Sequence, residues 1–147
     1  MMDKLDGRLL AELQKDGRVP ASTLAQTLGV PRSTVQERMR RLEAKGIVLG
    51  YQAVVDPAKL GTPSFAYILA SFQPGSGAQH RRLVQDLLKI DGIERVDMIS
   101  GEWDIILRVR GASLEAIGAM IVDKLRTIPA IARTLTLPSF HGVERGI

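Results

Sequence analysis

The sequence predicts an α+β protein in two parts, with helices in the first third and alternating strands and helices after it. In the first 45 residues, apolar side chains recur every three or four positions. After residue 63 that helical period is interrupted by short apolar segments typical of strands. Gly and Pro residues punctuate both parts, and a group of them in residues 56–63 marks the boundary.

Three helices are expected in the first part, over residues 4–15, 21–28 and 31–45. Each carries an apolar stripe along one side. Gly29 allows the positive φ of a sharp turn between the second and third helices, and Pro31 suits the first turn of a helix. Helix, short helix, glycine turn and basic helix together are typical of a helix-turn-helix domain.

The second part is expected to follow the order β-α-β-β-α-β, which is the ferredoxin-like plan. Its expected strands cover residues 65–72, 94–100, 103–110 and 131–140, and its expected helices cover 78–90 and the segment between Ser113 and Pro129. Residues 47–55 also have strand character. We therefore expect a helix-turn-helix domain over residues 1–46, a hinge strand and linker over 47–62, and a ferredoxin-like domain over 63–147.

Composition narrows the possible classes of protein. Hydrophobic residues make up 45% of the chain and charged residues 24%, as in soluble globular proteins. No apolar run is long enough for a membrane helix, and the first residues lack the layout of a secretory signal. The absence of cysteine excludes disulfides and thiolate metal sites. A cytoplasmic protein without a membrane partner is expected.

Positive charge is concentrated in the first part of the chain. The net charge is +4, and Arg32, Arg38, Arg40 and Arg41 fall within ten residues of the third predicted helix. Such a patch suits a polyanion such as double-stranded DNA, although a merely solvated helix face is the alternative.

The helical period assigns the side chains of this third helix. Val35, Met39 and Leu42 face inward, which turns Glu37 and Arg40 outward. The residues expected near base edges are Arg32, Ser33, Thr34, Gln36, Glu37 and Arg40. The residues expected to contact phosphate are Arg38, Arg41 and Lys45. A single recognition helix reads few base pairs, so a dimer is expected to place two of them about 34 Å apart.

A small-molecule site is expected near the turn between the two middle strands of the second part. If the helices cover the more apolar face, alternation puts Asp104, Thr134 and Thr136 near the other face. Asp104 suits the ammonium of an amino acid, and the N–H groups around Ser100 and Gly101 suit its carboxylate. The alternative is that Gly101 only makes the turn and Asp104 only caps it.

Several segments together resemble the Lrp/AsnC family of leucine-responsive and asparagine-responsive regulators, also called feast/famine regulatory proteins. The segments that carry the resemblance are Leu5-Asp6, Leu13-Gln14-Lys15-Asp16-Gly17-Arg18, Leu28-Gly29-Val30, Arg41-Leu42-Glu43, Gly50-Tyr51, Ser100-Gly101-Glu102-Trp103-Asp104 and Arg133-Thr134-Leu135-Thr136. Their order and spacing span nearly the whole chain. The chain departs from the family pattern at Pro31, where Ser is common, and at Trp103, where Tyr is more usual.

The resemblance implies properties beyond those indicated by the residues alone. The second domain would be the family's amino-acid-metabolism regulatory domain, whose sheets pair face to face into dimers that assemble further, often into octamers. An amino acid or related metabolite would bind between dimers and change assembly or DNA affinity. The function implied is transcription regulation.

Two other classes of protein compete with this assignment. Some relatives are haem-precursor decarboxylases that use histidines, but this chain has only His80 and His141 and shows no catalytic motif. No catalytic residue, metal or cofactor is therefore expected beyond a possible amino-acid effector. An architectural DNA-compacting protein without an effector needs the same basic helix, and the sequence leaves it open.

Overall fold

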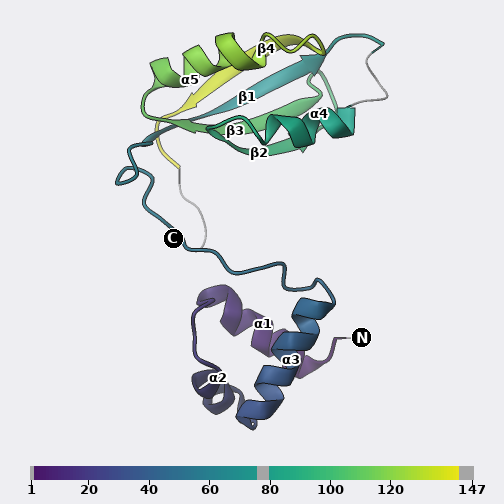
Figure 1. The fold of residues 1–147 in the computed structure, drawn as a ribbon, viewed down its shortest axis with the longest axis vertical. Coiled ribbons are helices and arrows are strands. Elements are labelled where there is room, and N and C mark those ends of the chain that lie inside the picture. The colour runs from purple at the N-terminus through teal and green to yellow at the C-terminus, as the bar shows by residue number, and fades with distance from the viewer. Residues whose placement is uncertain (1, 76–79, 143–147) are drawn as a thin grey trace. The chain divides into compact units, whose positions relative to one another are not determined.

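The structure, a computed structural model, describes residues 2–75 and 80–142 of the 147-residue chain. The chain divides into two compact units, and the division falls between Val54 and Val55. This point lies inside the linker predicted over residues 47–62. Figure 1 shows a helical first unit and a second unit in which helices pack on a sheet.

The first unit consists of three helices, α1 (Lys4–Lys15), α2 (Ala21–Leu28) and α3 (Arg32–Ala44). A capping box begins α1, because Asp3 and Asp6 each accept a hydrogen bond from the other's backbone N–H. α2 ends at Gly29, whose φ of 70° is left-handed and whose N–H donates to the carbonyl of Ala25. Pro31 precedes α3 and supplies no cap oxygen. The three predicted helices and their glycine turn are confirmed.

The core of the first unit is a cluster of aliphatic side chains from all three helices. Leu9 of α1, Leu24 of α2, and Val35 and Leu42 of α3 are almost completely buried. Each buried leucine contributes about 2 kcal/mol relative to an exposed one. Met39 is only partly buried against this cluster, so the inner stripe of α3 is narrower than predicted.

Residues 47–55 do not form the strand predicted for them. The N–H groups of Ile47 and Val48 both donate to the carbonyl of Leu42, at 2.9 and 3.2 Å, and so close the end of α3. The Tyr51 hydroxyl donates to Glu43 of the same helix at 3.1 Å. A strand needs a neighbour for its backbone groups, and the described chain places none beside this segment. Val48 packs against the core of the first unit, but the large apolar residues after it stay exposed, Leu49 by 94%.

The second unit has the predicted order of strands and helices. Its elements are β1 (Ser64–Phe72), α4 (His80–Leu87), β2 (Ile93–Met98), β3 (Ile105–Gly111), α5 (Leu114–Met120), its π-helical continuation η2 (Ile121–Leu125) and β4 (Ile131–Ser139). The strands form one antiparallel sheet in the order β2-β3-β1-β4. The ferredoxin-like plan is therefore confirmed (Figure 1). The helix predicted over residues 78–90 ends earlier than expected, and its first two residues lie outside the described part.

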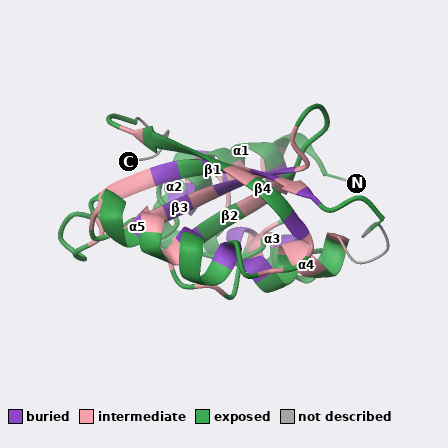
Figure 2. Ribbon diagram, turned by 90° about the horizontal axis from the view of Figure 1, so that it is seen from above, coloured by how far each residue is buried: buried purple, intermediate pink, exposed green. Residues whose placement is uncertain are grey.

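One face of this sheet packs against the helices. Along β1, Ala66, Ile68 and Ala70 are buried, whereas the intervening Tyr67 is exposed, and β3 alternates in the same way (Figure 2). The helices contribute Leu87, Ile117, Ile121 and Leu125 to the same cluster. We call the other side the open face; the strand register places on it Tyr67, Leu69, Arg95, Asp97, Ile106, Arg108, Arg133, Leu135 and Leu137.

Candidate functional site

The recognition helix predicted from the sequence is α3, and its outward side is polar and largely exposed. Of the nine residues predicted to contact DNA, two are half-buried, Thr34 and Arg38. The other seven are exposed: Arg32, Ser33, Gln36, Glu37, Arg40, Arg41 and Lys45. Within residues 2–75 and 80–142, Arg32, Arg40 and Lys45 make no ion pair. Their charges are therefore available to a polyanion.

Arg38 and Arg41 differ from these three because each already pairs with α1. The Arg38 guanidinium donates to Asp6 at 2.9 Å and also to Asp3. The Arg41 guanidinium donates to both carboxylate oxygens of Asp6, at 2.9 and 2.8 Å. Their predicted role as phosphate contacts stays a prediction. The structure shows that they hold α3 against the start of α1.

The charges of this group perturb one another in the expected directions. The hydrogen bond from Arg38 and the N–H of Asp6 lower the pKa of Asp3 to about 2. Burial alone would raise the pKa of Asp6, but the N–H of Asp3 and the two guanidinium groups outweigh it, and the pKa is lowered. The hydrogen bonds to Asp3 and Asp6 raise the pKa of Arg38. Asp3, Asp6 and Arg38 therefore stay ionised at neutral pH.

The ion pairs between Asp6 and the arginines of α3 were not predicted, although the sequence contains an indication of them. Asp6 occupies the same helical stripe as Leu9 and Leu13, three and seven positions along. A carboxylate in an apolar stripe requires a cationic partner. The third helix is rich in arginine, so its arginines were candidates for that partner.

Three of the predicted effector residues, Ser100, Gly101 and Asp104, lie in the turn between β2 and β3. Ser100 and Gly101 are exposed, and Gly101 has a φ of 129°. The N–H of Ile99 donates to the carbonyl of Asp104 at 2.8 Å and closes the hairpin. The Asp104 carboxylate accepts the N–H of Phe72 at 2.7 Å, so one of its oxygens holds the end of β1. This contact is with β1, so it differs from the cap of the turn that was the alternative for Asp104, and the predicted contact with an effector stays a prediction.

The expectation that Thr134 and Thr136 share the open face is wrong. Their register partners on β1 are Ala70 and Ile68, which lie on the helix-covered face. Residues directly opposite in an antiparallel pair point to the same side. The expectation failed because β4 is an edge strand with little burial on either side, so its apolar Leu135 does not mark the covered face.

Three residues make contacts at the turn that were not predicted: Glu102 and Trp103 within it, and Arg133 on β4. The Arg133 guanidinium lies 4.4 Å from the centroid of the Trp103 ring and donates to Glu102 at 3.0 Å. This arrangement combines a cation–π contact with an ion pair. It links the turn to the open face through β4.

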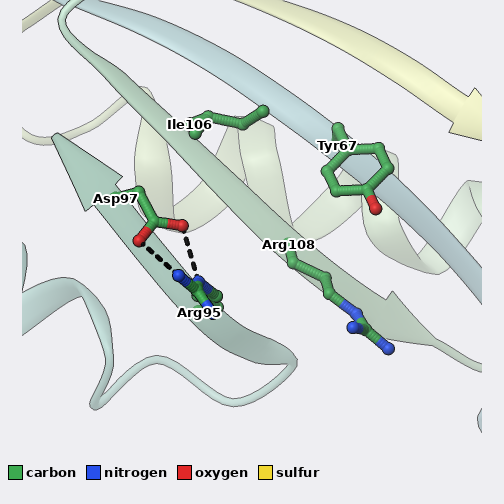
Figure 3. A pocket seen from close by; sticks show the side chains of 5 residues that line it. All are labelled: Tyr67, Arg95, Asp97, Ile106 and Arg108. Carbon is green, nitrogen blue, oxygen red and sulfur yellow. Dashed lines mark hydrogen bonds and ion pairs between the residues drawn. The ribbon is translucent and has the colours of Figure 1, made fainter. Parts of the chain in front are cut away.

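The open face contains a shallow cavity of about 240 Å³ lined by Tyr67, Arg95, Asp97, Ile106 and Arg108. Figure 3 shows Arg95 and Asp97 joined by two hydrogen bonds, at 2.6 and 3.0 Å. Arg108 also pairs with Glu94, at 3.0 Å. The cavity mixes both signs of charge with apolar side chains.

The described residues offer no group of three side chains suited to a metal ion. No helix among them is long and apolar enough to cross a membrane.

Comparison with family models decides the classification. Residues 2–43 match the AsnC-type helix-turn-helix domain, and residues 65–145 match the Lrp/AsnC ligand binding domain. The chain belongs to the Lrp/AsnC family. An uncharacterized HTH-type transcriptional regulator from Pyrococcus abyssi is 38% identical over 147 residues, which cover 100% of this chain and 98% of that protein.

Solved structures of Lrp/AsnC proteins agree with this classification. AsnC of E. coli has a TM-score of 0.87 and 25% identity, covering 100% of this chain and 98% of its own. The feast or famine regulatory protein from M. tuberculosis, complexed with L-methionine, has a TM-score of 0.88 and 30% identity, with 98% and 95% covered. The matching families and relatives are transcriptional regulators and not enzymes, as predicted.

Proposed function

We propose that this Lrp/AsnC chain is a sequence-specific regulator that binds double-stranded DNA and is modulated by an amino acid or a related metabolite. The observation that carries the proposal is the exposed side of α3, where Arg32, Arg40 and Lys45 have no carboxylate partner among the described residues. In this proposal residues 1–46 bind DNA, 47–62 link, and 63–147 bind the effector and oligomerise. The protein acts in the cytoplasm.

The proposed division of labour on α3 follows from exposure. Side chains near the start and outer side of a recognition helix meet base edges. Arginine and glutamine make paired hydrogen bonds with purines, and glutamate accepts from cytosine. The proposed base-reading residues are Arg32, Ser33, Thr34, Gln36, Glu37 and Arg40. Lys45, at the end of the helix, is proposed to contact phosphate.

The effector site is proposed at the turn between β2 and β3. Ser100 and Gly101 present exposed backbone for the carboxylate of an amino acid. One oxygen of Asp104 is held by Phe72, which leaves the other for an ammonium group. The L-methionine bound by the M. tuberculosis relative supports an amino acid as ligand class. Thr134 and Thr136, on the other side of β4, are proposed to contact it only from a neighbouring copy.

The open face is proposed to join two copies into a dimer, from which larger rings such as octamers assemble. Tyr67, Leu135 and Leu137 are large apolar side chains that this face leaves about two-fifths exposed. Glu94 and Arg108 add opposite charges, so that a two-fold axis can bring unlike charges together. A dimer supplies the second recognition helix that site-specific binding requires.

The decisive experiment is fluorescence anisotropy with the DNA upstream of the gene, at several salt concentrations, with and without a mixture of amino acids. Binding to a preferred site that the mixture shifts supports the proposal, and single amino acids then identify the effector. Binding indifferent to both sequence and mixture favours the architectural alternative. The absence of binding at moderate salt overturns the proposal.

A further inference from the structure

Among the described residues, Asp6 is the buried charged side chain, with an exposed fraction of 1%. A buried carboxylate is tolerated only when it is paired and hydrogen-bonded. Both oxygens of Asp6 are engaged: one accepts from Arg38, the other from the N–H of Asp3, and Arg41 donates to both. Each oxygen accepts two hydrogen bonds, so neither depends on water as a partner.

Asp6 fixes the orientation of α3 relative to α1, because its two cationic partners come from one side of α3. Arg38 and Arg41 are three residues apart, so their side chains lie on one side of α3. A carboxylate anchored by the capping box of α1 thus contacts α3 at two successive turns. Two contacts along a helix fix its rotation about its axis as well as its distance.

The same contacts reduce the number of positive charges on α3 that are available to DNA. Phosphate binding grows with the number of cations that reach the backbone, and it does not depend on sequence. Five cations lie on or next to α3, but Arg38 and Arg41 face carboxylates while Arg32, Arg40 and Lys45 do not. Specific binding depends on the orientation of the base-reading side chains, which the same pairing sets.

We propose that Asp6 is a positioning residue for DNA recognition, which withholds Arg38 and Arg41 from non-specific phosphate contacts and orients α3 for base reading. This inference rests on the proposed DNA-binding function. The sequence alone predicts that Arg38 and Arg41 contact phosphate. In this inference, specificity arises because Asp6 keeps both side chains away from phosphate.

The test compares the wild-type protein with Asp6→Asn, which keeps the shape of the side chain and removes its charge. Each protein is measured on a duplex that the wild type selects from a random pool and on a shuffled duplex of the same composition. We expect the ratio of specific to non-specific affinity to fall about tenfold. The slope of log affinity against log salt on the shuffled duplex should steepen by about 1 to 2, as released guanidinium groups reach phosphate.

Asp16→Asn is the matched control, because it removes the same charge from the exposed residue that follows α1. It should leave the affinity ratio and the salt slope close to wild type. A purely structural role for Asp6 predicts lower thermal stability with an unchanged ratio and slope in the molecules that remain folded, and that result overturns the inference.

A second variant keeps the test decisive if Asp6→Asn fails to fold by circular dichroism. Asp3→Asn retains a capping oxygen and frees only one contact of Arg38, at an exposed carboxylate. Because Asp6 still holds Arg38, this variant should steepen the salt slope by less than Asp6→Asn does, by about 0.5, and an unchanged slope overturns the inference. Failure of the wild type to bind any duplex overturns the proposed function instead, so the two failures are distinguishable.

Discussion

Arg40 is the residue on which the DNA-binding proposal can be tested most directly. It is exposed and has no ion-pair partner in the described part of the chain, so truncation should not disturb the fold. We expect Arg40→Ala to weaken binding to the selected duplex by at least about 1 kcal/mol, with an unchanged melting temperature. Arg18→Ala, which removes an equal charge outside α3, is the control for anisotropy. Equal losses in the two variants would contradict the assigned role.

The pKa of Asp3 gives a second test at the scale of the residue. Because this pKa is lowered from 3.8 to about 2 in the folded protein, the native state binds fewer protons than the unfolded chain between these values. The stabilisation is complete above pH about 4 and is lost as the pH falls through about 2. Asp6 acts in the same direction.

We therefore expect the melting temperature of the first unit to fall steeply over this acid range in the wild type, and less steeply in Asp3→Asn. Calorimetry at a series of pH values measures both slopes. Parallel curves for the two proteins would show that the ion pair with Arg38 contributes nothing to acid stability.

At the scale of the element, the turn between α2 and α3 depends on one backbone conformation. Gly29 has a left-handed φ, and a methyl group added there would meet no atom within 4 Å. The cost of Gly29→Ala is therefore conformational strain alone, and we expect a loss of about 1 to 2 kcal/mol in unfolding free energy. Denaturant titration measures it.

Gly7→Ala is the matched control, because Gly7 lies within α1 with open space at its side chain position and no positive φ. The same chemical change should stabilise the first unit by about 0.5 to 1 kcal/mol. Opposite signs at the two glycines are the expected result. A similar change at both would show that the turn conformation is not what Gly29 provides.

Most elements were predictable because they depend on local periodicity. The apolar stripes of α1 and α3 and the alternation in β1 reflect a single buried side, which sequence spacing reports directly. The helix predicted after Ser113 is present as well, and the Ser113 hydroxyl caps it by accepting the N–H of Ala116. These features require no knowledge of which elements become neighbours.

The failures have a different physical origin, since each depends on contacts between distant segments. The pairing of Asp6 with Arg41 joins residues 35 positions apart. The face occupied by Thr134 depends on its register with β1, and the state of residues 47–55 depends on whether another strand is present. The predicted DNA-contacting and effector residues remain predictions, because contacts with a ligand are not contained in the fold of one chain.

At the scale of the whole molecule, the proposed dimer depends on the open face. Leu137→Asp places a charge among the exposed apolar side chains of β4 without entering the covered core. We expect it to convert dimers to monomers in sedimentation experiments while the circular dichroism spectrum is kept. Val122→Asp, at an exposed position on η2, is the control and should remain dimeric. Unchanged dimers in Leu137→Asp would place the interface elsewhere.

Trp103 is the one tryptophan of the chain, and it lies in the turn where the effector is proposed to bind. Intrinsic emission excited selectively at the indole therefore originates from this turn alone. The guanidinium of Arg133 over the ring makes the emission sensitive to any displacement of β4 relative to the turn. The unmodified protein thus carries its own optical reporter, with which candidate metabolites can be screened without DNA and without a chemical label.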